Sequence, residues 1–201
     1  QLNDFIQSLA SLNEPFILVH GGGKLATDLA EKLNIPQQLI EGRRITDAET
    51  LKIATMVYAG YINKNIVAKL QKQNINSIGL SGADGNLMKA TKRIHQEIDY
   101  GFVGDIDQVN TVFFHGLIQQ ALVPVVSPIT HDGKGQLLNT NADTIAQSIA
   151  TAMSSFYETI LVYSFEKAGV LLDVSDESSV IQTITAARLL FREGKIFNAC
   201  I

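Results

Sequence analysis

The stretch that decides the fold of this chain is FILVHGGGKLATDLAEKL, residues 16–33. Residues 16–19 form a continuous apolar run, which is typical of a strand buried on both faces of a parallel sheet. The turn His20-Gly21-Gly22-Gly23 follows, and residues 24–33 then show helical spacing. Free N–H groups and the helix dipole make such a turn an anion site, although a tight turn without a ligand would look the same.

The same alternation of strands and helices continues along the chain. Thr46 and Glu49 have the spacing of a capping box for a long helix, with a kink expected at Gly60. Helices are predicted over residues 2–9, 46–73, 111–121, 142–152 and 186–193, strands over residues 77–80, 87–91, 102–106, 123–126 and 160–163, and a hairpin over residues 39–45 with its bend at Glu41-Gly42. This order predicts an α/β fold, an αβα sandwich with a mostly parallel central sheet.

The composition narrows the class of protein. The chain has 201 residues, of which 46% are apolar and 18% charged, so it can bury a substantial core. Its net charge of −4 disfavours nucleic acid as a partner, and no apolar run is long enough to span a membrane. The one cysteine, Cys200, excludes an intrachain disulfide and fits a reducing compartment, so we expect a cytoplasmic protein. Since Gln1 is not an initiator methionine, we expect a fragment or a chain without its ends.

The glycine turn also allows a dinucleotide-binding interpretation. Residues 21–26 fit G-x-G-x-x-A, and Glu41 lies about 20 residues further on, as a Rossmann site requires. Pro36 and Gly42 bracket Glu41 in an expected hairpin, however, where a second parallel strand should end. A Walker A site is excluded because Leu25 follows Lys24.

A second loop, Gly79-Leu80-Ser81-Gly82-Ala83, resembles the nucleophile elbow of α/β-hydrolases. In that alternative Ser81 is the nucleophile and His115 or His131 is the base. An elbow serine must be followed at once by a helix, whereas residues 83–86 have the composition of a turn. We therefore expect the histidines to be structural or surface residues.

A third candidate site is Asn139-Thr140-Asn141-Ala142-Asp143, which opens the helix over residues 142–152. Capping explains one such residue, but two asparagines and an aspartate exceed what a cap requires and can orient a polar ligand. For the pair Arg43 and Arg44 a solvated position is the default. Beside the glycine turn, one of them could instead clamp a carboxylate with two hydrogen bonds.

Six motifs in one order resemble the amino acid kinase family over nearly the whole chain. They are His20-Gly21-Gly22-Gly23, residues 42–46 (GRRIT), 79–87 (GLSGADGNL), 99–105 (DYGFVGD), 124–129 (PVVSPI) and 138–143 (LNTNAD). The resemblance implies the carbamate kinase-like fold of that family. It also implies transfer of the γ-phosphoryl group of ATP, with Mg²⁺, to the side-chain carboxylate of N-acetyl-L-glutamate or N-succinyl-L-glutamate in arginine biosynthesis.

The same resemblance implies a division of labour along the chain. Residues 1–156 would form the lobe that binds the N-acylglutamate and makes a homodimer, and residues 157–201 would begin the lobe that binds ATP. Gly22 and Gly23 would offer N–H groups to the carboxylate and the phosphoryl group, Arg44 would pair with the α-carboxylate, and Asn139 and Asn141 would bind the substrate. Asp143 would organise the catalytic lysines. The nucleotide-binding residues would be Ser164, Lys167, Gly169, Val170 and Leu171, and no residue is assigned as a metal ligand.

The chain departs from the family pattern in three places. The family's first strand, with Lys-x-Gly-Gly, and its second catalytic lysine are not found, and we transfer neither role to Lys24 or Lys195. The nucleotide loop at residues 164–171 is one residue longer than usual, which leaves the adenine contacts open and fits a subgroup that uses N-succinylglutamate. A non-catalytic homologue that binds acylglutamate is a further alternative.

Overall fold

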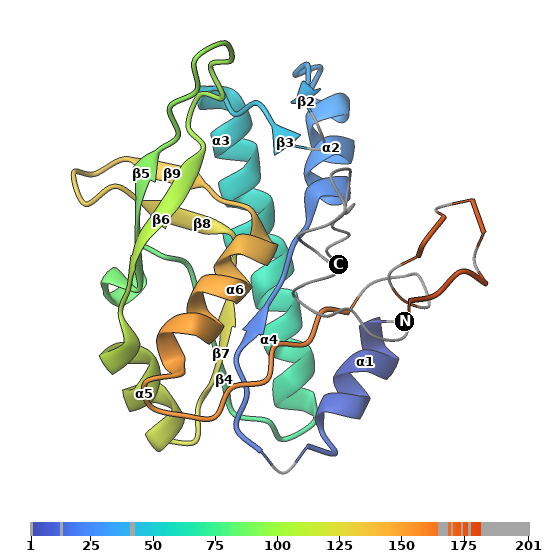
Figure 1. The fold of residues 1–201 in the computed structure, drawn as a ribbon, viewed down its shortest axis with the longest axis vertical. Helices are drawn as coiled ribbons and strands as arrows, with labels where there is room; N and C mark the ends of the chain where they lie inside the picture. The colour runs from blue at the N-terminus through green and yellow to red at the C-terminus, as the bar shows by residue number, and fades with distance from the viewer. Residues whose placement is uncertain are drawn as a thin grey trace. The chain divides into compact units, whose positions relative to one another are not determined.

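The computed structural model describes residues 2–12, 14–40, 43–164, 169, 171–173, 175–176 and 178–181 (Figure 1). The chain divides into two compact units, Gln1–Leu161 and Val162–Ile201. All of the long helices and sheets described below belong to the first unit. No helix of the described residues has the length and apolar character that crossing a membrane requires.

The central sheet of the first unit consists of three parallel strands in the order β1-β7-β4. They are β1 (Leu18–Val19), β7 (Val123–Val126) and β4 (Ser77–Leu80). Leu18 pairs with Val125 on one side, and Gly79 pairs with Val125 on the other. Val125 and Val126 are completely buried, as expected for a central strand with no polar face.

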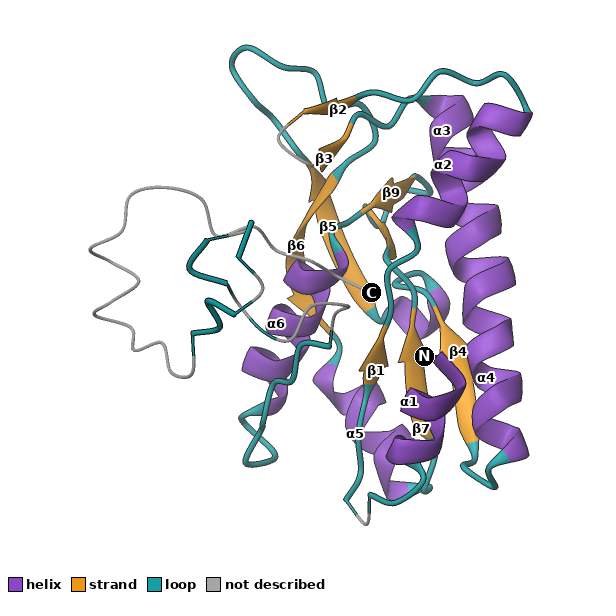
Figure 2. Ribbon diagram, turned by 90° about the vertical axis from the view of Figure 1, so that its right-hand side faces the viewer, coloured by secondary structure: helices purple, strands orange, loops and turns teal. Residues whose placement is uncertain are grey.

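Helices cover both faces of this sheet (Figure 2). Because neighbouring side chains of a strand point to opposite faces, Val125 and Val126 of β7 mark the two layers. Val125 packs with α1 (Leu2–Leu9) and α4 (Asn63–Lys72), through residues such as Ile6 and Leu70. Val126 packs with α5 (Thr111–Gln119) and α6 (Ala142–Met153), through residues such as Phe114 and Ile145. The predicted αβα arrangement with a parallel central sheet is confirmed.

The predicted helix over residues 46–73 is three consecutive segments. They are α3 (Ala48–Thr55), the π-helical segment η1 (Met56–Ile62), which contains Gly60, and α4. The capping box was wrong: Asp47 is the N-cap, and its carboxylate accepts a hydrogen bond from the N–H of Thr50 at 2.7 Å. Thr46 is instead fully buried, and its hydroxyl group donates a hydrogen bond to the carbonyl oxygen of Arg44 at 3.2 Å. Glu49 pairs with Lys52 on the exposed side of α3.

A second layer of structure lies beyond the carboxyl ends of the central strands. Its strands run in the order β6-β5-β8-β9, with β5–β8 parallel and the other pairs antiparallel. They are β5 (Met88–Lys92), β6 (Gly104–Val109), β8 (Ile129–His131) and β9 (Leu137–Asn139), and the short 3-10 helix η2 (Asp84–Asn86) precedes β5. The predicted hairpin forms from β2 (Leu39–Ile40) and β3 (Arg43–Arg44), and its expected bend at Glu41-Gly42 lies outside the described residues. Helix α2 (Gly23–Lys32) packs on α3 and η1 through Ala26, Ala30 and Tyr58.

Two expectations near the end of the chain have different outcomes. The strand predicted over residues 160–163 was wrong, because this segment has no ladder partner among the described residues and Ile160 is 86% exposed. The helix expected over residues 186–193 lies outside the described residues. In the second unit, Leu171 forms an isolated antiparallel bridge with Val180.

Candidate active site

The glycine turn joins the end of β1 to the start of α2. Gly22 is the N-cap residue of α2, and no side chain caps this helix. Its φ of 154° is one that L side chains rarely adopt, and an added Cβ would overlap Ile62 and lie 3.0 Å from Tyr58 Cδ1. The site therefore needs glycine here, and the first-turn N–H groups of α2 are left to bind something other than a capping side chain.

Strand β3, which carries Arg44, lies beside α2 (Figure 1). Arg44 Nη2 donates to the carbonyl oxygen of Gly23 at 2.9 Å and to Thr27 Oγ1 at 2.8 Å. Its Nη1 donates to Gln37 Oε1. Burial raises the pKa of Tyr58, and the nearby Arg44 acts in the opposite direction. The guanidinium group is therefore held in place at the start of α2 by contacts with Gly23, Thr27 and Gln37.

Asn139 is joined to Arg44 through one buried residue. The Asn139 side chain donates from Nδ2 to Thr46 Oγ1 at 3.0 Å, and the Thr46 hydroxyl donates to the carbonyl of Arg44. The backbone supports this link, since Asn139 N–H donates to Phe102 at 2.8 Å and Phe102 N–H donates to Thr46 at 2.6 Å. Hydrogen bonds thus connect residues of the turn, the hairpin and β9 at one end of the first unit.

Asn141 and Asp143 follow Asn139 at the start of α6. Asn141 is the N-cap, and its side-chain oxygen accepts from the N–H of Thr144 at 2.9 Å. Asp143 stands in the first turn and is 7% exposed. The positive end of the helix dipole favours a carboxylate at this position. Asn141 therefore has a structural task, whereas the buried Asp143 is not needed as a cap.

Sequence reasoning missed four residues that hold this region together: Thr27, Gln37, Thr46 and Asn63. Thr27 and Gln37 hold Arg44, and Gln37 also donates to Thr50 Oγ1 at 3.2 Å. Asn63 is completely buried and contacts His20. A polar residue on the apolar face of a helix was the available signal for Asn63, whereas nothing local marks Thr27 and Gln37. Thr46 was predicted as a helix cap, and its contacts with Arg44 and Asn139 were not predicted.

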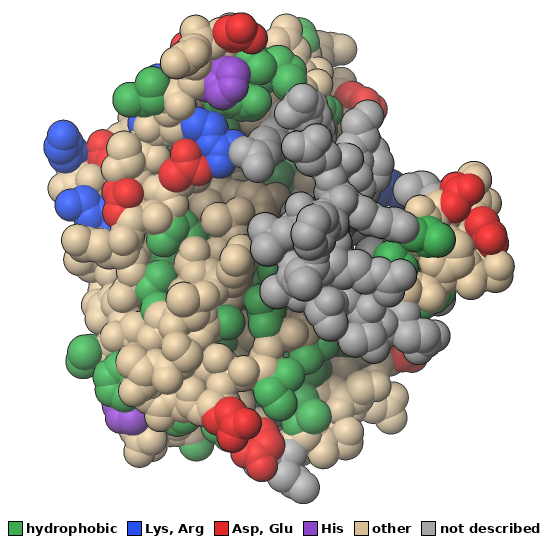
Figure 3. Space-filling model, in the orientation of Figure 1, with side chains coloured by type: hydrophobic (Ala, Val, Ile, Leu, Met, Phe, Trp, Pro, Cys, Tyr) green, Lys and Arg blue, Asp and Glu red, His purple; other side chains and the backbone are tan. Residues whose placement is uncertain are grey.

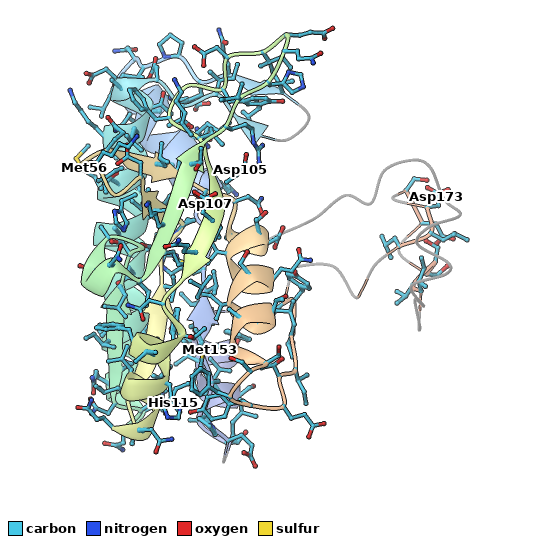
Figure 4. All side chains as sticks on the ribbon, turned by 60° about the vertical axis from the view of Figure 1, so that its left-hand side comes forward. Met56, Asp105, Asp107, His115, Met153 and Asp173 are labelled. Carbon is cyan, nitrogen blue, oxygen red and sulfur yellow. The ribbon has the colours of Figure 1, made fainter. Side chains whose placement is uncertain are left out.

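Ser81 does not have the surroundings of a catalytic nucleophile. Its N–H and its hydroxyl both donate to Asp84 Oδ2, at 2.6 and 2.8 Å. No described histidine is hydrogen-bonded to Ser81. His115 lies on α5 and contacts the Tyr157 hydroxyl at 2.8 Å, and Figure 4 shows it near the Met153 end of α6. His131 accepts from the N–H of Gly133 at 3.1 Å. The geometry gives no support to the hydrolase alternative.

The cavities and the surface charges of the described residues do not point to a second candidate site. A cavity of about 480 Å³ adjoins the residues that hold Arg44, and its lining includes Thr27, Ile35 and Gln37. Another of about 320 Å³ lies along α5. The face in Figure 3 carries scattered charged side chains of both signs and no extended basic patch. Among the residues that the structure describes, no group of three or more His, Cys, Asp or Glu side chains can hold a metal ion.

The expected nucleotide-binding residues belong to the second unit. Ser164, Gly169 and Leu171 are described, and a Cβ on Gly169 would lie 2.7 Å from Val180 Cγ1. Lys167 and Val170 lie outside the described residues.

Comparison with models of known protein families identifies the family to which the chain belongs. The model of the amino acid kinase family matches residues 1–193, almost the whole sequence. The chain belongs to the amino acid kinase family. The resemblance of the six motifs and the predicted fold class are thereby confirmed.

Curated relatives of this family member are named acetylglutamate kinase. The protein from Phocaeicola vulgatus is 54% identical over 184 residues, which is 92% of this chain and 72% of the relative. The protein from Cytophaga hutchinsonii is 55% identical over 91% of this chain and 70% of its own length. The protein from Methanopyrus kandleri is 39% identical over 90% of this chain and 74% of its own length.

Solved structures confirm the fold of this family member. A structure of smu.665 from Streptococcus mutans has a TM-score of 0.69 at 23% identity and covers 84% of this chain and 69% of that one. N-acetylglutamate synthase from Neisseria gonorrhoeae, complexed with coenzyme A and N-acetyl-glutamate, also has a TM-score of 0.69, at 22% identity. It covers 85% of this chain and 38% of the synthase.

Proposed function

We propose that this protein is an N-acylglutamate 5-kinase that transfers the γ-phosphoryl group of ATP to the side-chain carboxylate of N-acetyl-L-glutamate. The observation that carries the proposal is the 54% identity to a curated acetylglutamate kinase over 92% of this chain. The product is an acyl phosphate in arginine biosynthesis. N-succinyl-L-glutamate is the alternative substrate, because the loop at residues 164–171 is one residue longer than usual in the family.

Arg44 supplies the recognition of the amino acid in this proposal. An α-carboxylate and a guanidinium group form two parallel hydrogen bonds, which fix both the position and the direction of the ligand. The contacts of Arg44 with Gly23, Thr27 and Gln37 hold its guanidinium group beside the glycine turn. Asn139 is linked to the Arg44 backbone through the buried hydroxyl group of Thr46. Asn139 would bind the acylamino part of the substrate, and Asn141 would bind the substrate next to it.

The glycine turn and Asp143 supply the chemistry. Phosphoryl transfer depends mainly on positioning the reactants and on neutralising the charge that moves between oxygens. The N–H groups of Gly22 and Gly23, at the uncapped start of α2, would face the reacting carboxylate and the phosphoryl group. Asp143 would orient lysines supplied by other parts of the protein. We expect Mg²⁺ to be bound together with the phosphates of ATP, where it would neutralise part of their charge.

The division into lobes belongs to the same proposal. We assign acylglutamate binding and homodimer formation to residues 1–156, and the start of the ATP-binding lobe to residues 157–201. Ser164, Lys167, Gly169, Val170 and Leu171 would contact the nucleotide. Contacts within the chain separate Gln1–Leu161 from Val162–Ile201, close to this boundary. We expect the enzyme to act in the cytoplasm.

A single assay tests the activity. The full-length protein is incubated with Mg-ATP and either N-acetylglutamate or N-succinylglutamate, and hydroxylamine traps any acyl phosphate as a hydroxamate. Hydroxamate from one substrate supports the proposal and identifies the acyl group. If neither substrate gives hydroxamate although calorimetry shows acylglutamate binding, the protein is a non-catalytic binding homologue and the kinase assignment is wrong.

A further inference from the structure

We propose that Asn63 is a positioning residue that acts through His20: it holds the Gly21–Gly22 peptide so that the Gly22 N–H points away from the interior and towards the substrate. This inference rests on the proposed function, since it gives a cause for the orientation of an amide already assigned to the acylglutamate site. Neither Asn63 nor His20 touches the reacting atoms in this arrangement.

The orientation of the Asn63 side chain is determined by its partners. Asn63 is completely buried at the start of α4. Its Nδ2 donates to the carbonyl oxygen of Val125 in the central strand β7 at 2.9 Å, and a carbonyl can only accept. Its Oδ1 accepts from Lys64 Nζ at 3.1 Å, and the same ammonium group donates to the carbonyl of Gly79 at 2.9 Å. The carboxamide therefore cannot flip without losing both interactions.

The orientation of Asn63 determines the tautomer of His20. The second hydrogen of Asn63 Nδ2 is directed at His20 Nε2, 3.1 Å away, so Nε2 must be the acceptor. On the other side of the ring, His20 Nδ1 lies 2.8 Å from the carbonyl oxygen of Gly21 and must carry the proton. Burial lowers the pKa of His20, against a smaller opposite effect of the Gly21 carbonyl, so the neutral ring is the stable form.

The tautomer of His20 determines the direction of the Gly22 amide. A trans peptide is planar, and its C=O and N–H bonds point in opposite directions. The carbonyl of Gly21 and the N–H of Gly22 belong to one peptide unit. Because His20 draws the carbonyl towards the buried ring, the N–H of Gly22 is directed away from it. The chain of contacts from Val125 through Asn63 and His20 thus ends on the amide.

An independent observation in β4 supports a dedicated position for Asn63. Gly79 is the first glycine of the Gly79-Leu80-Ser81-Gly82 motif, which the proposed chemistry does not use. A Cβ on Gly79 would overlap Asn63 Oδ1 and would lie 2.7 Å from Lys64 Nζ. Glycine weakens the interior of a strand, but at this position it leaves the space that the Asn63 side chain occupies.

Two pairs of variants in the full-length protein test the inference. Asn63→Asp replaces the donor to His20 Nε2 by an acceptor and places a carboxylate oxygen against the Val125 carbonyl. Asn65→Asp is its control, because Asn65 is exposed on the same helix. Gly79→Ala displaces Asn63 without changing its chemistry. Gly116→Ala is the matched control, because an added Cβ meets nothing within 4 Å there.

The expected result is a selective kinetic loss. Asn63→Asp and Gly79→Ala should lower kcat/KM for the acylglutamate by about tenfold to a hundredfold, the scale on which small misplacements affect positioned groups. The KM for ATP should change less than about twofold, since the nucleotide is bound elsewhere. Both controls should match the wild type. A KM for ATP that rises as much as the KM for the acylglutamate, or no loss in either test variant, would overturn the inference.

A spectroscopic measurement separates this inference from the proposed function. Long-range ¹⁵N–¹H NMR spectra of the wild type at pH 7 should show His20 protonated on Nδ1 only, and Asn63→Asp should change that state together with the Gly22 amide resonance. A His20 ring protonated on Nε2 in the wild type, or a Gly22 resonance unchanged in the variant, contradicts the inference. If the wild type phosphorylates no acylglutamate, the proposed function fails while these spectra still decide the role of Asn63.

Discussion

Arg44 donates a hydrogen bond to the carbonyl oxygen of Gly23 at 2.9 Å, although 21 positions separate the two residues in the chain. This contact joins the end of the hairpin to the first turn of α2. It brings a permanent positive charge to a helix start that no side chain caps. An anionic ligand at this place would meet both the guanidinium group and the N–H groups of the turn.

Replacement of Arg44 by alanine tests this relationship directly. We expect Arg44→Ala to raise the KM for the acylglutamate by about tenfold to a hundredfold, because a hydrogen bond to a charged group contributes roughly 1.5–3 kcal/mol. The KM for ATP should stay within about twofold. Steady-state kinetics with each substrate varied in turn measures both values. Arg93→Ala is the control, since Arg93, which directly follows β5, pairs with Asp105 of β6. An equal rise in both KM values would count against the role of Arg44.

Replacement of Gly22 by alanine tests the need for a bare backbone in the turn. The backbone φ of 154° and the overlap with Ile62 should cost about 1–3 kcal/mol of unfolding free energy. Activity should fall as well, because the turn must shift to relieve the overlap. Gly60→Ala is the control, since a Cβ there meets nothing within 4 Å and helix formation favours alanine. Urea unfolding of both variants decides the point, and equal stability would disprove the strain.

The N-cap of α3 distinguishes the observed structure from the capping box. Asp47→Ala should reduce the free energy of unfolding by about 1 kcal/mol, because the Thr50 N–H loses its acceptor. Glu49→Ala should cost no more than about 0.5 kcal/mol, since Glu49 only pairs with exposed Lys52. Chemical denaturation at neutral pH measures both. A larger loss from Glu49→Ala than from Asp47→Ala would restore the capping box.

Asp143 offers a test of chemistry without loss of the fold. Asp143→Asn keeps the size of a side chain that is 7% exposed but removes its charge. We expect kcat to fall by about a hundredfold or more, as when a group acting in the transition state is lost. The circular dichroism spectrum should not change. A kcat close to that of the wild type would exclude a role for Asp143 in catalysis.

The buried His20 predicts a dependence of stability on pH. Burial lowers its pKa below the ordinary value of 6.5, so the unfolded chain binds a proton at a higher pH than the folded one. The free energy of unfolding should therefore fall as the pH decreases from 6.5 towards the lowered pKa. His20→Asn should lack this component, whereas His95→Asn, at an exposed position, should retain it. Unfolding curves between pH 8 and pH 5, on both sides of the ordinary pKa of 6.5, measure the difference. Parallel curves for the wild type and His20→Asn would contradict it.

Local patterns predicted the elements that depend on a few neighbouring residues. The strands over residues 77–80 and 123–126 match β4 and β7, and Asn141 caps α6 as expected. The wrong predictions concern segments whose conformation depends on residues far away in the sequence. Thr46 has the local pattern of a cap but is buried against Arg44 and Asn139. Residues 160–163 have the apolar composition of a strand, but they form no ladder with any described strand.

The sequence by itself determined the order of strands and helices, the glycine turn at the start of α2 and the family, because apolar periodicity, caps and motifs are properties of adjacent residues. Only the tertiary structure decided which residues form hydrogen bonds with each other across the site. Arg44 and Gly23, or Asn63 and His20, are 21 and 43 positions apart and meet because β1, β7 and the packed helices bring them together. Hydrogen bonds over such separations depend on sheet register and helix packing, which no local pattern encodes.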